Sequence, residues 1–316
     1  MRKIIFTLFL FVATLTISQE KFSKEISFIT DNDLYVSIIR DRYYTSGIFL
    51  GYKYLSKNKK EALEKKIIEW QLKHEMYTPY KPTVTNILEH DRPFAGYLYG
   101  NFGVNRVYKN EQILKTSIQF GVIGSNAKAK EVQQFIHDIY GFKKAVGWQY
   151  QIENALAINF KANYVKQLYK TQNNSLDISW VNNINIGTVY TNASTGFYSR
   201  VGLKPLQKLT NSITFGTNLN NEQNNSFREI ESFFYINPMI RYALYDATIE
   251  GSFLNTTSPV TKGLMPFIFN LEIGIKFTAN RFNFGYAFIY NTSKSEGLRY
   301  KYGHKYGAIS INYLLR

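Results

Sequence analysis

The residues best able to do chemistry lie in a few short polar clusters. Asp31, Asn32 and Asp33 form one cluster, which suits a metal or catalytic site and equally an ordinary polar turn. Gln133 and His137 lie four residues apart, which places both on one face of a predicted helix. Histidine titrates near neutral pH, but a histidine beside apolar helix positions is often structural. Taken singly, none of these clusters identifies a reaction.

The elements that must position these residues are predicted to be β-strands, because most of the chain alternates apolar with polar residues. Ile309, Ile311 and Tyr313 share one face of the last such segment, and Ser310 and Asn312 share the other. Several segments exceed the ~5–6 residues of globular strands and suit tilted membrane strands of ~9–11 residues. We count about twelve segments, at residues 25–31, 43–55, 66–77, 95–108, 112–124, 150–168, 176–190, 194–204, 229–250, 264–278, 281–292 and 304–316.

Composition narrows the fold class. The chain has 316 residues, with 25 Tyr, 24 Phe and no Cys, and its mean hydropathy is −0.26. The lack of cysteine excludes disulfides, Cys zinc sites and thiol nucleophiles, and no internal segment has the ~18 apolar residues of a membrane helix. Tyrosine suits the interfacial girdles of membrane barrels. The sequence therefore predicts an all-β transmembrane antiparallel β-barrel of about 12 strands, with a soluble β-sandwich as the alternative.

The first residues have the layout of an export signal. Arg2 and Lys3 precede an apolar stretch, and the small residues Thr16 and Ser18 stand at the −3 and −1 positions of a cleavage point after Ser18. This layout predicts a secretory signal peptide at residues 1–18 and a single outer-membrane domain at residues 19–316, with an N-terminal anchor helix as the alternative. The formal net charge of +15 favours anionic partners such as lipopolysaccharide, anionic lipid or nucleic acid. Charge alone does not choose among them.

Three segments depart from the strand pattern. Residues 127–140 carry apolar residues at helical spacing and end at Gly141, which predicts a short loop helix. The lysine-rich residues 56–66 are predicted to form a solvated turn. The Asn- and Gln-rich residues 218–225 are predicted to form a flexible loop.

Barrel topology brings the polar clusters to one rim. If the N-terminus is periplasmic, the odd-numbered connections lie outside the cell. The first and third connections, the start of the second strand and the predicted helix of the fifth connection then meet at the outer end. The residues placed at this rim are Asn32, Asp33, Thr45, Lys81, Asp91, Arg92, Gln133 and His137.

An ordered series of motifs runs along the first half of the chain. In order they are Asp31-Asn32-Asp33, Asp41 to Gly47, Leu50-Gly51-Tyr52, Asp91 to Gly96, Gly121 to Gly124, Glu131 to Gln134 with His137, and Gly147 to Asn154. This series resembles the outer-membrane lipid A 3′-O-deacylases, and the last block is close to diagnostic. The resemblance is strong over residues 26–154 and architectural beyond them.

The resemblance implies a twelve-stranded barrel that hydrolyses the ester-linked acyl (acyloxyacyl) chain at the 3′ position of lipid A and requires Ca²⁺. It also implies an outer-membrane location, a lipopolysaccharide substrate and no nucleic-acid partner. The sequence leaves the oligomeric state open, and we favour a monomer. Matched by position, the catalytic residues are His137, Asn32, Asp33 and Thr45, the metal ligands are Asp33 and Asn32, and the substrate-binding residues are Lys81 and Gln133.

These residue types suit ester hydrolysis. His137 can activate water as a general base, and a hard cation held by oxygen ligands can polarise the ester carbonyl. The sequence has no Gly-x-Ser-x-Gly elbow, so we favour water as the nucleophile, with Thr45 as a covalent nucleophile the alternative. Two other functions stay open: a binding or transport barrel without catalysis, and a phospholipase A-type barrel acting on glycerophospholipids.

The predicted helix, residues 127–140, is expected to fold against the outer end of the barrel wall. Phe135, Ile136 and Ile139 would then pack on the wall or line an acyl groove. The alternative is a helix that plugs the lumen.

Overall fold

The structure, a computed structural model, describes residues 21–36, 42–58, 60–221 and 230–316. The predicted signal peptide, residues 1–18, lies outside this described part. No helix within it is long and apolar enough to span a membrane.

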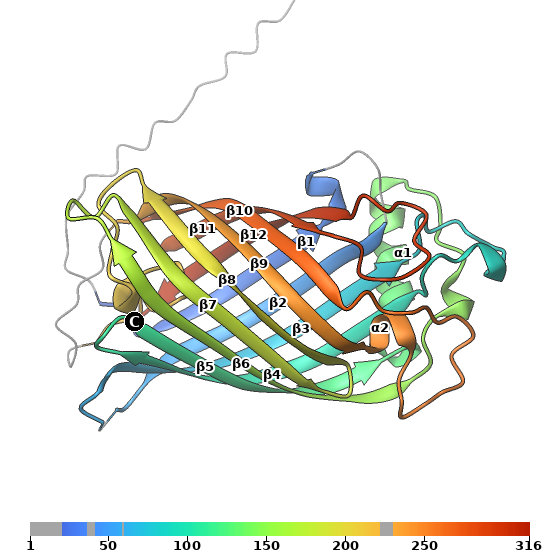
Figure 1. Cartoon of the computed structure of the whole chain (residues 1–316), viewed down its shortest axis with the longest axis horizontal. Helices are drawn as coiled ribbons and strands as arrows, with labels where there is room; N and C mark the ends of the chain where they lie inside the picture. Colours follow the sequence, from blue (N-terminus) through green and yellow to red (C-terminus); the bar gives the residue numbers. More distant parts are fainter. Residues whose placement is uncertain (1–20, 37–41, 59, 222–229) are drawn as a thin grey trace, which may run out of the picture.

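Twelve antiparallel strands form one closed barrel, as predicted (Figure 1). Each strand pairs with its neighbours along the chain, and the first strand pairs with the last. Because the barrel is closed, the backbone N–H and C=O groups of every strand can hydrogen-bond to neighbouring strands, which they must do in lipid, where no water is available. The strands are β1 (Lys24–Asn32), β2 (Tyr43–Ser56), β3 (Leu63–Thr78), β4 (Ala95–Tyr108), β5 (Gln112–Ile123), β6 (Ala155–Lys170), β7 (Leu176–Gly187), β8 (Tyr190–Gly202), β9 (Ser232–Asp246), β10 (Phe267–Ala279), β11 (Phe282–Asn291) and β12 (His304–Leu315).

The strand faces follow the alternation in the sequence. On β10, Phe267 and Phe269 are exposed on the outer wall, whereas Ile268 is buried on the inner face. Lys276 also points inward, and its ammonium donates to the main-chain oxygen of Thr214 in the lumen. Apolar side chains therefore face the lipid side and polar ones the lumen, as in other membrane barrels.

Several predicted boundaries are wrong. β7 ends at Gly187 and not at 190, and β8 begins at Tyr190 and not at 194. Residues 150–154 are not strand, because the chain makes a 3₁₀ turn at Trp148–Tyr150 and β6 begins only at Ala155. The predicted turn at residues 56–66 is shorter than expected, because β3 already begins at Leu63.

Two helices occur at strand connections. The predicted loop helix is α1 (Ala129–Tyr140), and it ends at Gly141, whose φ of 67° favours glycine. A second helix, α2 (Ala247–Glu250), replaces the predicted end of β9 at residues 247–250. It forms because the Asp246 carboxylate accepts a hydrogen bond from the Thr248 main-chain N–H.

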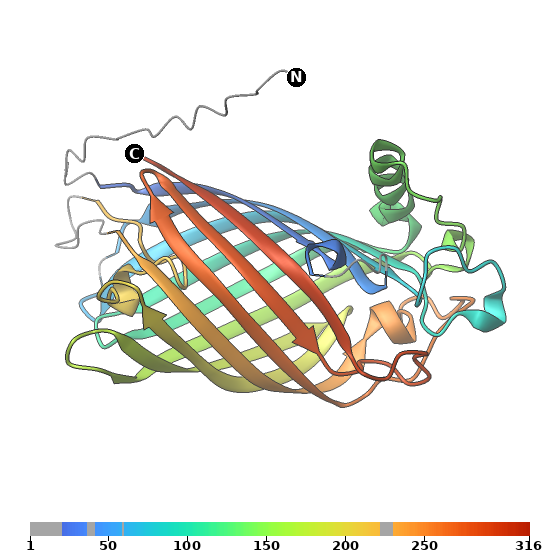
Figure 2. The same cartoon turned by 90° about the horizontal axis from the view of Figure 1, so that it is seen from above.

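The two ends of the barrel differ. The C-terminus and the start of β1 lie at one end, and the connections that carry α1 and α2 lie at the other (Figures 1 and 2). The predicted site residues all flank strand ends at this second end, which we call the α1 end.

The β8–β9 connection folds back into the lumen from the terminal end. We call its residues 205–220 the plug. Lys65 and Lys115, which point inward from the wall, donate to main-chain oxygens of Thr217 and Phe215. The predicted flexible loop is wrong for Asn218 to Asn220, which are buried inside the barrel; residues 222–225 lie outside the described part.

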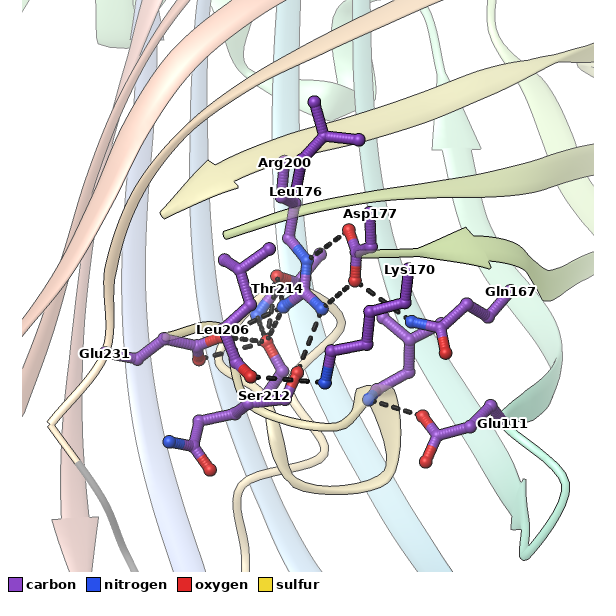
Figure 3. Close-up of polar contacts among 12 residues, drawn as sticks. Glu111, Gln167, Lys170, Leu176, Asp177, Arg200, Leu206, Ser212, Thr214 and Glu231 are labelled. Atoms are coloured by element: carbon purple, nitrogen blue, oxygen red, sulfur yellow. Dashed lines mark hydrogen bonds and ion pairs between the residues drawn. The ribbon is translucent and has the colours of Figure 1, made fainter. Parts of the chain in front are cut away.

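Arg200 of β8 anchors the plug (Figure 3). Its guanidinium forms buried ion pairs with Asp177 of β7 and with Glu231, which follows the plug. It also donates to the hydroxyls of Ser212 and Thr214 within the plug. Because removing one partner of a buried pair costs ~3–5 kcal/mol, these contacts hold the plug in place.

Candidate functional site

A row of paired residues crosses the outer face of the wall at the α1 end. Asn32 pairs with Ser46, Ser46 with Met76, and Met76 with Gly96. Directly paired residues point to the same face, with Cβ atoms ~4.5–5.5 Å apart. This face is the outer one, because Phe28, four residues before Asn32, is exposed on it. We call these four paired residues the rim row.

Helix α1 packs on the outer face of the wall, at the rim row. A Cβ added to Gly96 would lie 2.6 Å from the Cβ of Ala129, so glycine allows the first turn of the helix to touch β4. Met76 and Ala129 belong to one buried apolar cluster, and Ile136 packs against it. Figure 2 shows α1 outside the barrel. The predicted position on the wall is confirmed, and the alternative of a helical plug is wrong.

The predicted contacts of two helix residues differ. Phe135 and Ile139 do not pack on the wall, because they are 67% and 63% exposed. They lie on the side of α1 away from the barrel. Their apolar side chains are exposed at the surface of the protein beside the rim row.

His137 lies on the buried side of α1, and only 2% of it is exposed. Its Nδ1 is 2.6 Å from the main-chain oxygen of Lys143. A carbonyl oxygen only accepts, so Nδ1 carries a proton, and in the neutral ring the lone pair is on Nε2. The Phe142 ring packs edge-on against the imidazole. These two contacts fix the orientation of the imidazole ring on α1.

Gln133, one turn before His137, is also 2% exposed. Its Oε1 accepts a hydrogen bond from the Trp148 indole N–H at 2.7 Å. Within the described part of the chain, its Nε2 has no hydrogen-bond partner. A buried donor without a partner costs ~1–3 kcal/mol, so this amide is suited to bind a substrate oxygen.

The block Gly147 to Asn154, which we call the clasp, ties the β5–β6 connection to the barrel. A Cβ on Gly147 would lie 2.3 Å from the Phe94 ring, which leaves room for glycine alone. The Ile152 N–H donates to the Phe94 oxygen at 2.8 Å. The Asn154 side chain accepts from the Asn126 N–H just before α1. The clasp therefore holds both ends of the segment that carries α1.

Asn32 and Asp33 lie where β1 meets the β3–β4 connection. The buried Asp33 carboxylate accepts from the Arg42 main-chain N–H at 2.9 Å, and the Arg42 side chain donates to the Tyr80 oxygen at 3.4 Å. The Asn32 Oδ1 accepts from the Leu34 N–H and caps the 3₁₀ turn that follows β1. The two residues thus lie near the segment that carries Lys81.

Thr45 lies in a bulge of β2 between Tyr44 and Ser46. Its buried hydroxyl is 2.8 Å from the hydroxyl of Thr78 at the end of β3. A bulge redirects a side chain at a rim, and here it brings Thr45 toward the strand that carries Met76 of the rim row.

Lys81 is exposed just after β3. Its ammonium lies 5.2 Å from the centre of the Tyr80 ring. The adjacent Pro82 oxygen accepts from the Val146 N–H at 3.0 Å, which joins this connection to the one that carries α1. The structure therefore places Asn32, Asp33, Thr45 and Lys81 around the ends of β1 to β3. It places Gln133 and His137 on α1, which packs against β3 and β4.

Sequence reasoning placed Asp91 at the rim but missed its role. Its carboxylate accepts from the Tyr80 N–H, the Tyr43 hydroxyl and the Arg299 N–H. Asp91 therefore braces the β3–β4 and β11–β12 connections against each other. Trp148 was also missed as the partner that fixes Gln133; its place in the Gly147 to Asn154 motif was the available signal.

The donors around Asp33 fit Ca²⁺ in kind but are few. Carboxylate and amide oxygens are the ligands this ion prefers, and it takes 6–8 of them. Within the described residues, no group of three or more His, Asp or Glu side chains gathers. Asp33 and Asn32 would therefore suit a weak site, completed by main-chain oxygens and water.

The fold can be compared with known proteins. Among solved structures, LpxR from Salmonella typhimurium superimposes with a TM-score of 0.70 at 18% identity, over 92% of this chain and 99% of that one. The β domain of the Bordetella autotransporter BrkA gives a TM-score of 0.48 at 8% identity, over 94% and 99%. The first likeness shows the barrel fold. A search of curated protein sequences gave no match.

A family profile described as "Outer membrane protein LpxR" matches residues 4–315. The match spans nearly the whole sequence, including the strands, the rim row, α1 and the clasp. The chain therefore belongs to the LpxR family of outer membrane β-barrel proteins.

Proposed function

We propose that this protein is an outer-membrane esterase that removes the 3′-linked acyl (acyloxyacyl) chain of lipid A. One observation carries the proposal: α1 presents His137 beside the outer face of the barrel wall, where membrane lipid lies, and not in the lumen. A soluble substrate would not need a site on this face. Family membership supports the same substrate.

His137 is the proposed general base. It would take a proton from water through Nε2 while the water oxygen attacks the ester carbonyl carbon. The tetrahedral group would then collapse, and the proton would pass to the departing sugar oxygen. The Gln133 Nε2 would donate to a substrate oxygen, and Lys81 would meet a lipid A phosphate as a point charge.

Water is the proposed nucleophile, because the Thr45 hydroxyl lies at hydrogen-bond distance from another hydroxyl, that of Thr78. A nucleophilic hydroxyl needs a base within reach, and a second threonine is not one. The contact therefore favours water over a covalent Thr45 intermediate.

Ca²⁺ is the proposed cofactor, held by Asp33 and Asn32. For this, the Asn32 oxygen would have to exchange the Leu34 N–H for the ion. When bound, Ca²⁺ would polarise the ester carbonyl. The small number of carboxylates predicts weak binding.

The exposed apolar edge of α1 is the proposed acyl contact. Phe135, Ile139 and Tyr140 are all more than 60% exposed on this helix. Exposed apolar patches mark membrane or ligand contacts.

The plug argues against a transport function. Any solute crossing the barrel would meet the plug, which is anchored by the buried ion pairs of Arg200. An alternative enzyme, acting on glycerophospholipids, would use the same wall-side site.

The lipid A mass spectrum of cells with and without the protein tests the proposal. Loss of one acyloxyacyl group when the protein is made would support it. An unchanged lipid A spectrum together with released phospholipid fatty acids would instead identify a phospholipase. Unchanged lipids of both kinds would reject an esterase.

A further inference from the structure

The outer half of the lumen holds a cavity of about 330 Å³ below the connections of the α1 end. None of the residues proposed for ester hydrolysis lines it. The cavity is therefore separate from the wall-side site, and its chemistry needs its own explanation.

Three basic side chains line this cavity from different elements. They are Lys161 of β6, Arg241 of β9 and Lys294 of the β11–β12 connection. Across the described residues, none of the three side chains makes a hydrogen bond or ion pair. All three are partly exposed to the lumen and not fully buried, so an anion that enters the cavity can reach them.

The carboxylates of the same cavity do not complete it. Glu75 accepts hydrogen bonds from the hydroxyls of Tyr77, Tyr99 and Tyr190. A second carboxylate, Asp246, caps α2, and a third, Asp31, accepts from the Tyr44 hydroxyl. These groups offset part of the positive charge but bond to neutral donors, so they are not the partners of the three cations.

The basic groups also oppose one another. Burial and the nearby Arg241 guanidinium lower the pKa of Lys294 to about 8. A fourth cation, Arg92, lines the same cavity but is already bonded to the main-chain oxygen and hydroxyl of Thr248. An anion placed among these groups would relieve their repulsion.

We propose that this cavity binds a small oxyanion of the phosphate class, with Lys161, Arg241 and Lys294 as its charged ligands. A group with several acceptor oxygens can bond to all three, since guanidinium and ammonium groups are the usual partners of phosphate oxygens. The proposal does not rest on the esterase function.

The anion reaches the cavity from the α1 end. Residues of the external connections, including Thr248 and Ser293, line the cavity there, and the plug fills the lumen at the other end. The wall is closed by hydrogen-bonded strands, so a lipid cannot enter sideways. A free oxyanion or a phosphate on a polar headgroup therefore has to come over the rim.

Titration calorimetry with inorganic phosphate tests the site, using the full-length protein in dodecyl maltoside at constant ionic strength. We expect saturable binding of one phosphate per chain. Arg241→Gln and Lys294→Gln should each weaken it about tenfold, the usual scale for one charged hydrogen bond. Lys301→Gln, an exposed change on the same connection as Lys294, is the matched control and should leave binding unchanged. Heat-modifiable gel migration reports that each variant is folded.

The two sources of phosphate are separated by repeating the titration in vesicles with phosphatidylglycerol. Equal affinity in detergent and vesicles supports a free oxyanion; weaker binding in vesicles means that headgroups compete for the cavity and supports the headgroup source. No saturable binding by the unmodified chain, or an equal loss in Lys301→Gln, would overturn the proposal.

Discussion

His137 and His90 are both buried near the α1 end, but their surroundings differ. The His90 ring packs against Phe94 and Tyr150, and burial lowers its pKa below the usual value. It is therefore a neutral structural residue. Both rings lie within hydrogen-bond distance of a main-chain oxygen, that of Val84 for His90 and that of Lys143 for His137. The two histidines differ in the element that carries them: His137 lies on α1, which packs on the rim row, whereas His90 lies in the β3–β4 connection.

Replacing the proposed base should remove activity and leave the barrel intact. His137→Ala is expected to lower the rate of lipid A deacylation by ~10²–10⁴-fold, the usual loss for a general base. The helix lies outside the strand ladder, so heat-modifiable migration should persist. Asp138→Ala, an exposed change on the same helix, is the control. Near-full hydrolysis by the purified His137→Ala variant would refute the assignment.

If Asp33 holds Ca²⁺, deacylation should depend on both the ion and this residue. Chelation should stop deacylation by the unmodified protein, and added Ca²⁺ should restore it. Asp33→Asn removes the single charged ligand and should raise the Ca²⁺ concentration needed for half activity at least about tenfold, since ligand charge sets affinity. Activity would be measured across a Ca²⁺ series buffered with chelator. Full activity after exhaustive chelation would rule out metal assistance.

At the scale of elements, alternation predicted the strands well because outward and inward positions face different solvents. The alternation pattern gave the wrong prediction where a run of polar residues is buried and hydrogen-bonded inside the protein. The Asn-rich start of residues 218–225 reads as a loop, yet Asn218 to Asn220 are buried in the plug, where Asn220 bonds to Asn211. Residues 150–154 of the clasp were predicted to begin a strand, because Tyr150 and Ile152 alternate with polar residues. Asn220 is held by Asn211 and Ile152 by Phe94. Neither contact can be predicted from a local pattern of apolar and polar residues.

The clasp makes a prediction of its own. Trp148→Phe keeps the ring against Phe94 but removes the indole N–H that fixes Gln133. We expect deacylation to fall about tenfold, because the Gln133 amide loses its anchor. Trp180→Phe, on the outer wall, is the matched control. The deacylation rates of the two purified variants are compared. An equally small effect in both would mean that the clasp does not position a catalytic residue.

At the scale of the whole molecule, topology alone brought the polar clusters to one rim, since alternate connections of a barrel share an end. The position of the rim row on the outer face depends on the register in which strands β1 to β4 pair. Asn32, Met76 and Gly96 fall in one row only because each strand pair is aligned as it is, and a shift of one residue would turn the row to the lumen. The sequence does not state those alignments, so the wall-side position of the site required the structure.

The proposed site functions only if the α1 end faces outward, where lipid A lies. The chain contains no cysteine, so single cysteines can report orientation. Leu88→Cys, 87% exposed in the β3–β4 connection, should react with a membrane-impermeant maleimide on intact cells. Lys109→Cys, exposed in the β4–β5 turn at the opposite end, should react only after the outer membrane is permeabilised. The reverse pattern would place the site in the periplasm, away from the outer leaflet, and would exclude lipid A of that leaflet as its substrate.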